Sequence, residues 1–186
     1  MTSAWPVREL NAHDRGAYET HLVALGAEDR RLRFGTPVGD GVVRDYIARI
    51  DFDRDAVFGI VDDRLQLVGA AHLARGDDYA ELGVSVLPEY RKRGFGAALL
   101  ERAALHARNW GRAKLFMHCL RENATMMHLA RKQGMDIVTE AGEADAWLKL
   151  PQPDAGSYFG EVFAQRVALF DFALKSLRPR FPKFQV

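Results

Sequence analysis

Short apolar runs and stretches with helical spacing follow one another along the chain, and their order predicts a mixed α/β fold. The N-terminal part is expected to form a strand over residues 7–10 and then a helix in which Tyr18, Leu22 and Leu25 share one face. A second helix is predicted over residues 42–50. The chain therefore begins with a β-α-α order.

The middle of the chain predicts a meander of three strands. Apolar runs cover residues 57–61, 65–74 and 79–86, and only short turns containing Asp or Gly separate them. Turns of this length favour antiparallel neighbours, because a parallel connection needs a dozen or more residues.

The pattern changes after residue 86. A helix is predicted over residues 94–111, a strand over 114–120, a helix over 123–133, and two final strands over 137–139 and 144–150. We therefore expect a mixed, mostly antiparallel central sheet of the α/β (α+β) class with helices on both faces.

A polar segment with two prolines, residues 151–156, precedes a long amphipathic helix predicted over residues 158–177. We divide the chain into one domain, residues 1–150, and an extension, residues 151–186, formed by the linker and this helix. Mixed and few flanking charges favour burial of its apolar stripe against protein rather than membrane. Packing on its own domain, a homodimer through the helix and binding of another partner all stay open. The stripe contains Phe159, Val162, Phe163, Val167, Phe170, Leu174 and Leu177.

Composition and charge narrow the classes of function. The 186 residues are 48% hydrophobic and 27% charged, which is typical of a globular domain and not of a disordered chain. The 26 Lys and Arg residues nearly cancel the 25 Asp and Glu residues, and the net charge of +1 argues against a nucleic-acid partner. No run approaches the roughly 18 apolar residues of a membrane span, and the N-terminus lacks a signal-peptide pattern. We therefore expect a cytoplasmic protein with no membrane partner.

The sequence offers few candidate ligands for a metal-binding site. The single cysteine, Cys119, excludes an intramolecular disulfide and a cysteine-rich zinc site. His118 precedes it in a predicted strand, where adjacent side chains point to opposite faces and cannot easily share one ion. We expect no metal, and we interpret Cys119 as a small buried apolar residue.

The run from residue 84 to residue 100 is the most informative part of the chain. A strand ends in a loop with three cations, Arg91 to Arg93, and the glycines Gly94 and Gly96, and this loop opens a helix. Backbone N–H groups at a helix N-terminus bind anions, and glycines let the backbone approach a phosphate closely. The pattern predicts a diphosphate site. It matches neither the dinucleotide-binding fingerprint, which needs a small residue where Leu99 stands, nor the Walker loop.

Arg91-x-x-Gly94-x-Gly96 after a Val-x-Val-x-Pro strand end resembles the acetyl-CoA motif of the GNAT superfamily of N-acetyltransferases. Asn123 followed by Gly134-Met135 is similar to the family's asparagine-containing helix, and the resemblance covers about residues 5–150. It implies a GNAT-like sheet with a splayed strand pair, acetyl-CoA as co-substrate and an amine acceptor, either a protein lysine or a small molecule. The cofactor-binding residues that it implies are Val84, Ser85, Val86, Arg91, Lys92, Arg93, Gly94, Phe95, Gly96, Ala97, Asn123, Met126 and Leu129.

The resemblance also implies catalytic groups. Ala80-Glu81 before an apolar strand, and the segment of residues 29–34, are similar to Pat-type protein lysine acetyltransferases, in which the glutamate is the general base. Glu81 is thus the expected base, and the backbone N–H of Val84 the expected oxyanion donor. The family's tyrosine acid is replaced by Ala130. This departure keeps a non-catalytic acyl-CoA-binding or sensor module open as the alternative, and a nucleotide-dependent enzyme of another type is a weaker one.

Overall fold

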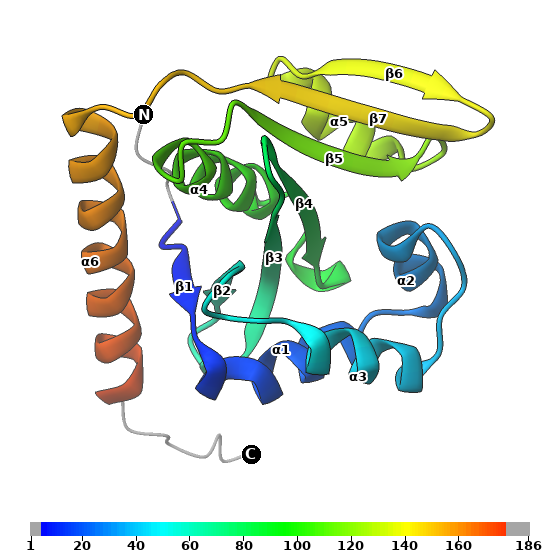
Figure 1. Ribbon diagram of the computed structural model, residues 1–186. Coiled ribbons are helices and arrows are strands. Elements are labelled where there is room, and N and C mark those ends of the chain that lie inside the picture. Colours follow the sequence, from blue (N-terminus) through cyan, green and yellow to red (C-terminus); the bar gives the residue numbers. More distant parts are fainter. Residues whose placement is uncertain (1–4, 178–186) are drawn as a thin grey trace, which may run out of the picture.

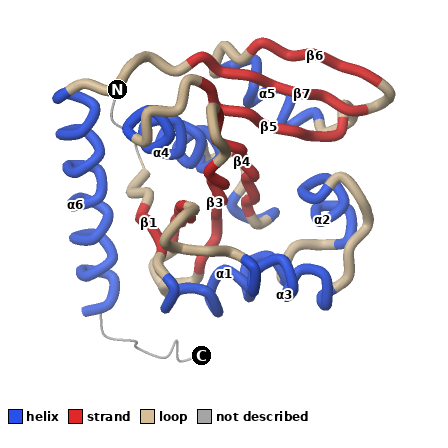
Figure 2. The backbone as a smooth tube through the Cα atoms, viewed as in Figure 1, coloured by secondary structure: helices blue, strands red, loops and turns tan. Residues whose placement is uncertain are grey.

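The computed structural model describes residues 5–177, which form one seven-stranded sheet in the order β1-β2-β3-β4-β5-β7-β6 (Figures 1 and 2). Within these residues every neighbouring pair of strands is antiparallel except β4 and β5, which are parallel. The predicted mixed, mostly antiparallel sheet is therefore confirmed. The strands are β1 (Arg8–Leu10), β2 (Ala56–Val61), β3 (Leu67–Arg75), β4 (Tyr79–Val86), β5 (Lys114–Leu120), β6 (Asp136–Glu140) and β7 (Glu143–Lys149).

Helices cover both faces of the sheet. Leu99 of α4 lies against one face at Gly69 of β3, whereas His21 of α1 contacts the other face at Ser85 of β4. Gly69 pairs with Val86 in the β3–β4 register, and Ser85 is the residue before Val86. Because successive strand residues point to opposite faces, Gly69 and Ser85 belong to opposite faces of the sheet. The α-helices are α1 (Arg15–Val23), α2 (Ala27–Phe34), α3 (Asp40–Arg49), α4 (Phe95–Asn109), α5 (Ala124–Lys132) and α6 (Ala155–Leu177), and short 3-10 turns cover Ala12–Asp14 and Pro88–Tyr90.

Strand β4 shows how the sequence pattern forms the core. Ala80 and Leu82 are buried with α4 on one face of the sheet, while Glu81 between them is exposed on the other. Leu99 and Leu100 of α4 are buried at the same interface. Burying each such leucine contributes about 1.5–3 kcal/mol relative to exposure, so the α4 interface is a major part of the stability.

Helix α2 is an element that the sequence pattern did not predict. Residues 27–34 contain few apolar side chains, so they carry no strong helical periodicity. Acidic residues Glu28 and Asp29 in the first turn suit the helix dipole, and Gly35 ends the helix in the left-handed region at φ 76°. The result is a short charged helix beside β4 and β5 (Figure 1).

The long helix α6 lies outside β1 and α4 at one side of the molecule (Figure 1). It begins at Ala155, earlier than predicted, because Asp154 accepts a hydrogen bond from the Ser157 backbone and so caps its first turn. Glu161 on this helix contacts Arg102 and His106 of α4. Glu9, His106 and Glu161 cluster as metal ligands sometimes do, but the Arg102 guanidinium inside the cluster supplies the positive charge. Over residues 5–177, no helix has the length and apolar character needed to cross a bilayer.

Candidate active site

A cleft opens where strands β4 and β5 diverge. The two strands pair only over Tyr79–Glu81 and Lys114–Phe116, and beyond that point each continues without the other. The opening has a volume of about 490 Å³ and is lined by β4 from Glu81 to Val86 on one wall and by Met117 to Cys119 of β5 on the other. Parallel strands that separate in this way leave backbone groups unpaired along the gap, so an extended ligand can add to the edge of β4.

The loop before α4 closes one end of the cleft. Lys92 and Gly94 both have positive φ values, 59° and 86°, which turn the chain sharply into the helix. No side chain caps the N-terminus of α4, so its first N–H groups are available to an anion. Gly94 adopts a conformation that side chains disfavour, which explains the glycine at this position.

Arg91 of this loop is held by helix α2. Its guanidinium forms an ion pair with Asp29 at 2.8 Å and donates to the carbonyl of Val86 at 3.2 Å. On the opposite side, Arg31 of α2 pairs with Glu122 at 2.7 Å, next to the start of α5. Helix α2 thus connects the two sides of the cleft, the loop before α4 and the start of α5, through charged side chains.

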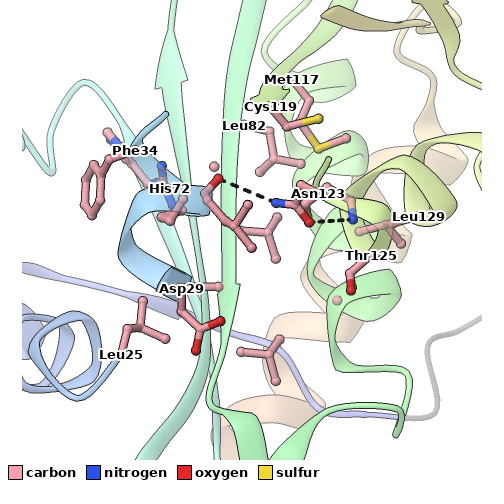
Figure 3. A pocket seen from close by; sticks show the side chains of 18 of the residues that line it. Leu25, Asp29, Phe34, His72, Leu82, Met117, Cys119, Asn123, Thr125 and Leu129 are labelled. Atoms are coloured by element: carbon pink, nitrogen blue, oxygen red, sulfur yellow. Dashed lines mark hydrogen bonds between the residues drawn. The ribbon is translucent and has the colours of Figure 1, made fainter. Parts of the chain in front are cut away.

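Asn123 lies on the β5 side of the cleft and caps α5. Its Oδ1 accepts a hydrogen bond from the backbone of Met126 at 3.1 Å, and its Nδ2 donates to the carbonyl of Leu32 in α2 at 3.5 Å. Figure 3 shows both bonds, with Asn123 directed toward the cleft and Asp29 and His72 on the facing side. The cap fixes the direction of the side chain, because the amide oxygen is tied to the helix.

The other end of the cleft carries titratable side chains. Glu81 is the last residue of β4 that pairs with β5, and it is exposed where the strands separate. In the β3–β4 register Ala74 faces Glu81 and His72 faces Gly83, so Glu81 and His72 point to the same face of the sheet. Both line the cleft.

A chain of hydrogen bonds runs beside this end of the cleft, from Arg33 of α2 to Asp55. Arg33 donates to the Tyr46 hydroxyl at 3.1 Å, that hydroxyl contacts His72 Nδ1 at 2.6 Å, and His72 Nε2 contacts Asp55 at 3.1 Å. Arginine only donates and a carboxylate only accepts, so Tyr46 donates to His72, and His72 donates to Asp55. Burial lowers the pKa of His72 and outweighs its bond to Asp55, which agrees with a neutral imidazole in this chain.

Gly83 makes room for Arg33 in this arrangement. A Cβ at this position of β4 would collide with the Arg33 guanidinium. The guanidinium therefore rests on the β4 backbone, two residues beyond Glu81, and places a fixed positive charge inside the cleft.

His21 of α1 forms hydrogen bonds with the chain at Leu67 and with Ser85 of β4. Its Nδ1 contacts the carbonyl of Leu67 at 3.0 Å and its Nε2 contacts the Ser85 hydroxyl at 2.8 Å. A carbonyl only accepts, so Nδ1 carries the proton and Nε2 accepts from Ser85. Burial lowers the pKa of His21 to about 4, and the charge of Arg33 adds to the effect. The imidazole is neutral at pH 7 and fixes the Ser85 hydroxyl.

The structure brings most of the predicted site residues together around the cleft between β4 and β5. Those that line it are Glu81, Val84, Ser85, Val86, Arg91, Lys92, Gly94, Phe95, Gly96, Asn123, Met126 and Leu129. Arg93 and Ala97 do not line it. Arg93 instead donates to the Glu89 carbonyl at 3.0 Å and covers the Tyr90 ring.

Sequence reasoning missed the group around Tyr46 and His72. The available signal was one histidine in an otherwise apolar strand, but only the β3–β4 register shows that it shares a face with Glu81.

Ala130 and Cys119 have the environments that the sequence suggested for them. Ala130 is buried and offers no acid, and burial raises the pKa of the Cys119 thiol, with Asp145 adding to it.

Comparison with known proteins identifies the family. The sequence profile of the acetyltransferase (GNAT) family matches residues 26–135. The fold is similar to the GNAT domain of S. lividans PAT, with 20% identity and a TM-score of 0.67 over 77% of this chain and 89% of that one. Spermidine N-acetyltransferase from Vibrio cholerae, crystallised with CoA and spermine, has 18% identity and a TM-score of 0.63 over 77% and 94% of the two chains.

A third similar fold is ribosomal-protein-alanine N-acetyltransferase from Brucella melitensis, with 19% identity and a TM-score of 0.58 over 77% and 99% of the chains. A search of curated protein sequences found no match. The match to this family, on a fold with splayed strands β4 and β5, defines the class of protein as an acyltransferase of the N-acetyltransferase type. The chain belongs to the GNAT acetyltransferase family, which uses acetyl-CoA.

Proposed function

We propose that the protein transfers the acetyl group of acetyl-CoA to a primary amine, on a protein lysine or a small molecule, by direct attack in a ternary complex. The observation that carries this proposal is the cleft between β4 and β5. Beyond Val86 at one end lies the uncapped N-terminus of α4, and at the other end lie titratable groups around Glu81. Five residues of strand separate these ends by about 17 Å, which suits a long arm bound between a diphosphate and a thioester. We take residues 1–150 as the catalytic unit and expect it to act in the cytoplasm.

Acetyl-CoA would be held by backbone and side chain together. The pantetheine arm would pair with the edge of β4 at Val84, Ser85 and Val86, where β5 no longer pairs in register. The diphosphate would bind N–H groups of the segment from Lys92 to Ala97, in which Lys92, Gly94, Phe95 and Gly96 line the cleft. Support for this comes from the positive φ values in the loop and the uncapped start of α4. Met126 and Leu129 would pack on the cofactor from the α5 side.

Glu81 would be the general base. A lysine-like amine has a pKa near 10.4, so its deprotonation at pH 7 costs about 4.6 kcal/mol, and a carboxylate in reach can take the proton during attack. The amine nitrogen then bonds to the thioester carbon, the C–S bond breaks and CoA leaves as a thiolate. The Val84 N–H would donate to the oxyanion. CoA leaves without a dedicated acid, since thiol pKa values near 8.5 make the thiolate a tolerable leaving group.

The chain from Arg33 to Asp55 would position the acceptor rather than donate a proton to sulfur. Tyr46 and His72 face the same part of the cleft as Glu81, and the hydrogens of the Tyr46 hydroxyl and of His72 Nε2 are already used inside the chain. The remaining lone pair of the Tyr46 hydroxyl can accept a hydrogen bond from an incoming amine. The acceptor would thus approach from the α3 side, opposite the β5 wall.

A panel of primary amines and lysine peptides, assayed for CoA release, tests the function. We expect release that depends on amine and acetyl-CoA, with acetylated product found by mass spectrometry. Tight acetyl-CoA binding without release for any amine would instead support the non-catalytic acyl-CoA-binding module.

Glu81→Gln tests the role of the base, with Glu140→Gln on the exposed edge strand β6 as a matched control. General-base catalysis contributes about 10²- to 10⁴-fold, so the Glu81 variant should lose at least about 100-fold in kcat near neutral pH while acetyl-CoA affinity changes little. Full activity of Glu81→Gln between pH 6 and pH 9 would exclude this role.

A further inference from the structure

The helix α6 turns its polar face toward its own domain. Glu161 contacts Arg102 at 2.6 Å, Gln165 accepts a hydrogen bond from the backbone of Glu9 at 3.0 Å, and Lys175 donates to the Val61 carbonyl at 3.0 Å. Burial would raise the pKa of Glu161, but hydrogen bonds from His106 and Asn109 and the charges of His106 and Arg102 lower it to about 2. These bonds fix the rotation of the helix about its axis.

The opposite face of α6 is apolar and lies in solvent, the reverse of the usual amphipathic arrangement. Phe159 is 77% exposed, Phe170 67% and Phe163 60%. We call this face the outer stripe; it consists of Tyr158, Phe159, Val162, Phe163, Val167, Leu169, Phe170, Leu174 and Leu177. Among the exposed residues of Ala155–Leu177, Arg166 alone is charged. An apolar patch of this extent on a folded protein marks an interaction surface.

The spacing within α6 is that of a helix–helix seam. Positions 156, 159, 163, 166, 170, 173 and 177 alternate in steps of three and four residues, and each is exposed. This is the heptad period with which two helices pack along their length. Its members are apolar or small apart from Arg166 near the middle of the helix.

The size of the outer stripe fits a stable dimer. A helix of 23 residues is about 35 Å long. Its nine large apolar side chains leave roughly 1,000 Å² of apolar surface accessible, and a stable interface buries about 800 Å² on each partner. The apolar area that the outer stripe offers is therefore of the size that a stable dimer interface needs.

We propose that α6 is the interface of a homodimer, in which the outer stripes of two copies of this chain pack against each other. A second copy provides a helix of matching length with the same seam, as a two-fold symmetric interface requires. A membrane suits the helix less well, because an interfacial helix keeps its charged face free beside the headgroups, whereas the polar face of α6 is bound to its own domain. Among the described residues, none from α6 lines the cleft, so dimerisation leaves acetyl-CoA binding intact.

Sedimentation equilibrium of the full chain at micromolar concentration tests the proposal. We expect a mass of about twice 20.9 kDa for the unchanged protein. Phe163→Glu and Phe170→Glu should each raise the dimer dissociation constant at least about 100-fold, since each buries a charge in the seam. The control is Val138→Glu, which places the same charge on an apolar side chain of β6 that is 62% exposed; it should leave the dimer unchanged.

Arg166→Leu is expected to strengthen the dimer, a result that misfolding of the variant would not produce. Removing the one charge of the seam should tighten the dimer, because two copies no longer bury a guanidinium. Acetyl-CoA thermal shifts of all four variants should equal that of the unchanged protein, which separates this proposal from the proposed catalysis.

A monomer at 100 µM overturns the proposal, as does dissociation of the dimer by Val138→Glu but not by Phe163→Glu. Weaker dimerisation of Arg166→Leu also counts against it. Binding of the monomer to phosphatidylcholine–phosphatidylglycerol vesicles, lost in Phe163→Glu, would assign the outer stripe to membranes instead.

Discussion

The buried pair of His21 and Ser85 makes the stability of the protein depend on pH. His21 donates from Nδ1 to the Leu67 carbonyl and accepts at Nε2 from the Ser85 hydroxyl. Protonation would place a positive charge on a ring that is 2% exposed and in the field of the Arg33 guanidinium, and Nε2 could then no longer accept from the Ser85 hydroxyl. The folded state therefore resists protonation, and the pKa of His21 falls from 6.5 to about 4.

The sign and size of the effect follow from this shift. Between pH 6.5 and pH 4 the unfolded chain binds the proton and the folded chain does not, so stability falls as the pH is lowered through this range. At 1.36 kcal/mol for each pKa unit, the complete loss is about 3 kcal/mol. About 2 kcal/mol of it should occur between pH 7 and pH 5.

Urea denaturation of the unchanged protein and of His21→Gln, at several pH values from 7 to 5, measures this contribution. Glutamine cannot titrate, so the stability difference between the two proteins should shrink by about 2 kcal/mol over the range while other groups cancel. Stability profiles that run parallel would show that His21 is not held neutral, and the account of Ser85 would be wrong with it.

Three further substitutions test the cleft. Gly83→Ala should cost about 1–3 kcal/mol in urea denaturation, because its Cβ displaces Arg33. Gly16→Ala in helix α1, with open space around it, should stabilise by up to about 1 kcal/mol, and equal stability of the two variants would contradict the contact. Asn123→Ala should lose about 1 kcal/mol with the α5 cap and Asn123→Asp should not, and equal losses would argue against a capping role. Asp29→Asn should lower the dissociation constant of acetyl-CoA about 1.5- to 5-fold by calorimetry, since it frees Arg91 from an exposed ion pair; weaker binding would mean that Asp29 orients Arg91 usefully.

Local patterns were enough to predict most of the sheet. Strands β4 and β5 occur at the predicted residues, because an alternating or continuous apolar run bounded by turns fixes where a strand begins and ends. The loop from Arg91 to Gly96 could also be interpreted from sequence, since its chemistry depends on neighbouring backbone groups. Helix α2 could not, because its place depends on ion pairs with Arg91 and Glu122, which lie about 60 and 90 residues away.

Features that depend on contacts between distant elements could not be predicted from the sequence. The approach of His72 and Glu81 follows from a register that no single strand contains. The rotation of α6 was equally hidden: the amphipathic pattern left its apolar stripe free to cover its own domain, and the bonds of Glu161 and Gln165 turn that stripe outward.

A crystal structure of the protein with CoA would show whether the cleft between β4 and β5 is the acetyl-CoA site. We expect the diphosphate within hydrogen-bond distance of backbone N–H groups of residues 92–97, and the pantetheine arm between β4 and β5 beside Val84 and Val86. Its sulfur should lie on the Glu81 side of the cleft. CoA bound on another surface, or no binding at millimolar CoA, would contradict the assignment of the cleft as the acetyl-CoA site.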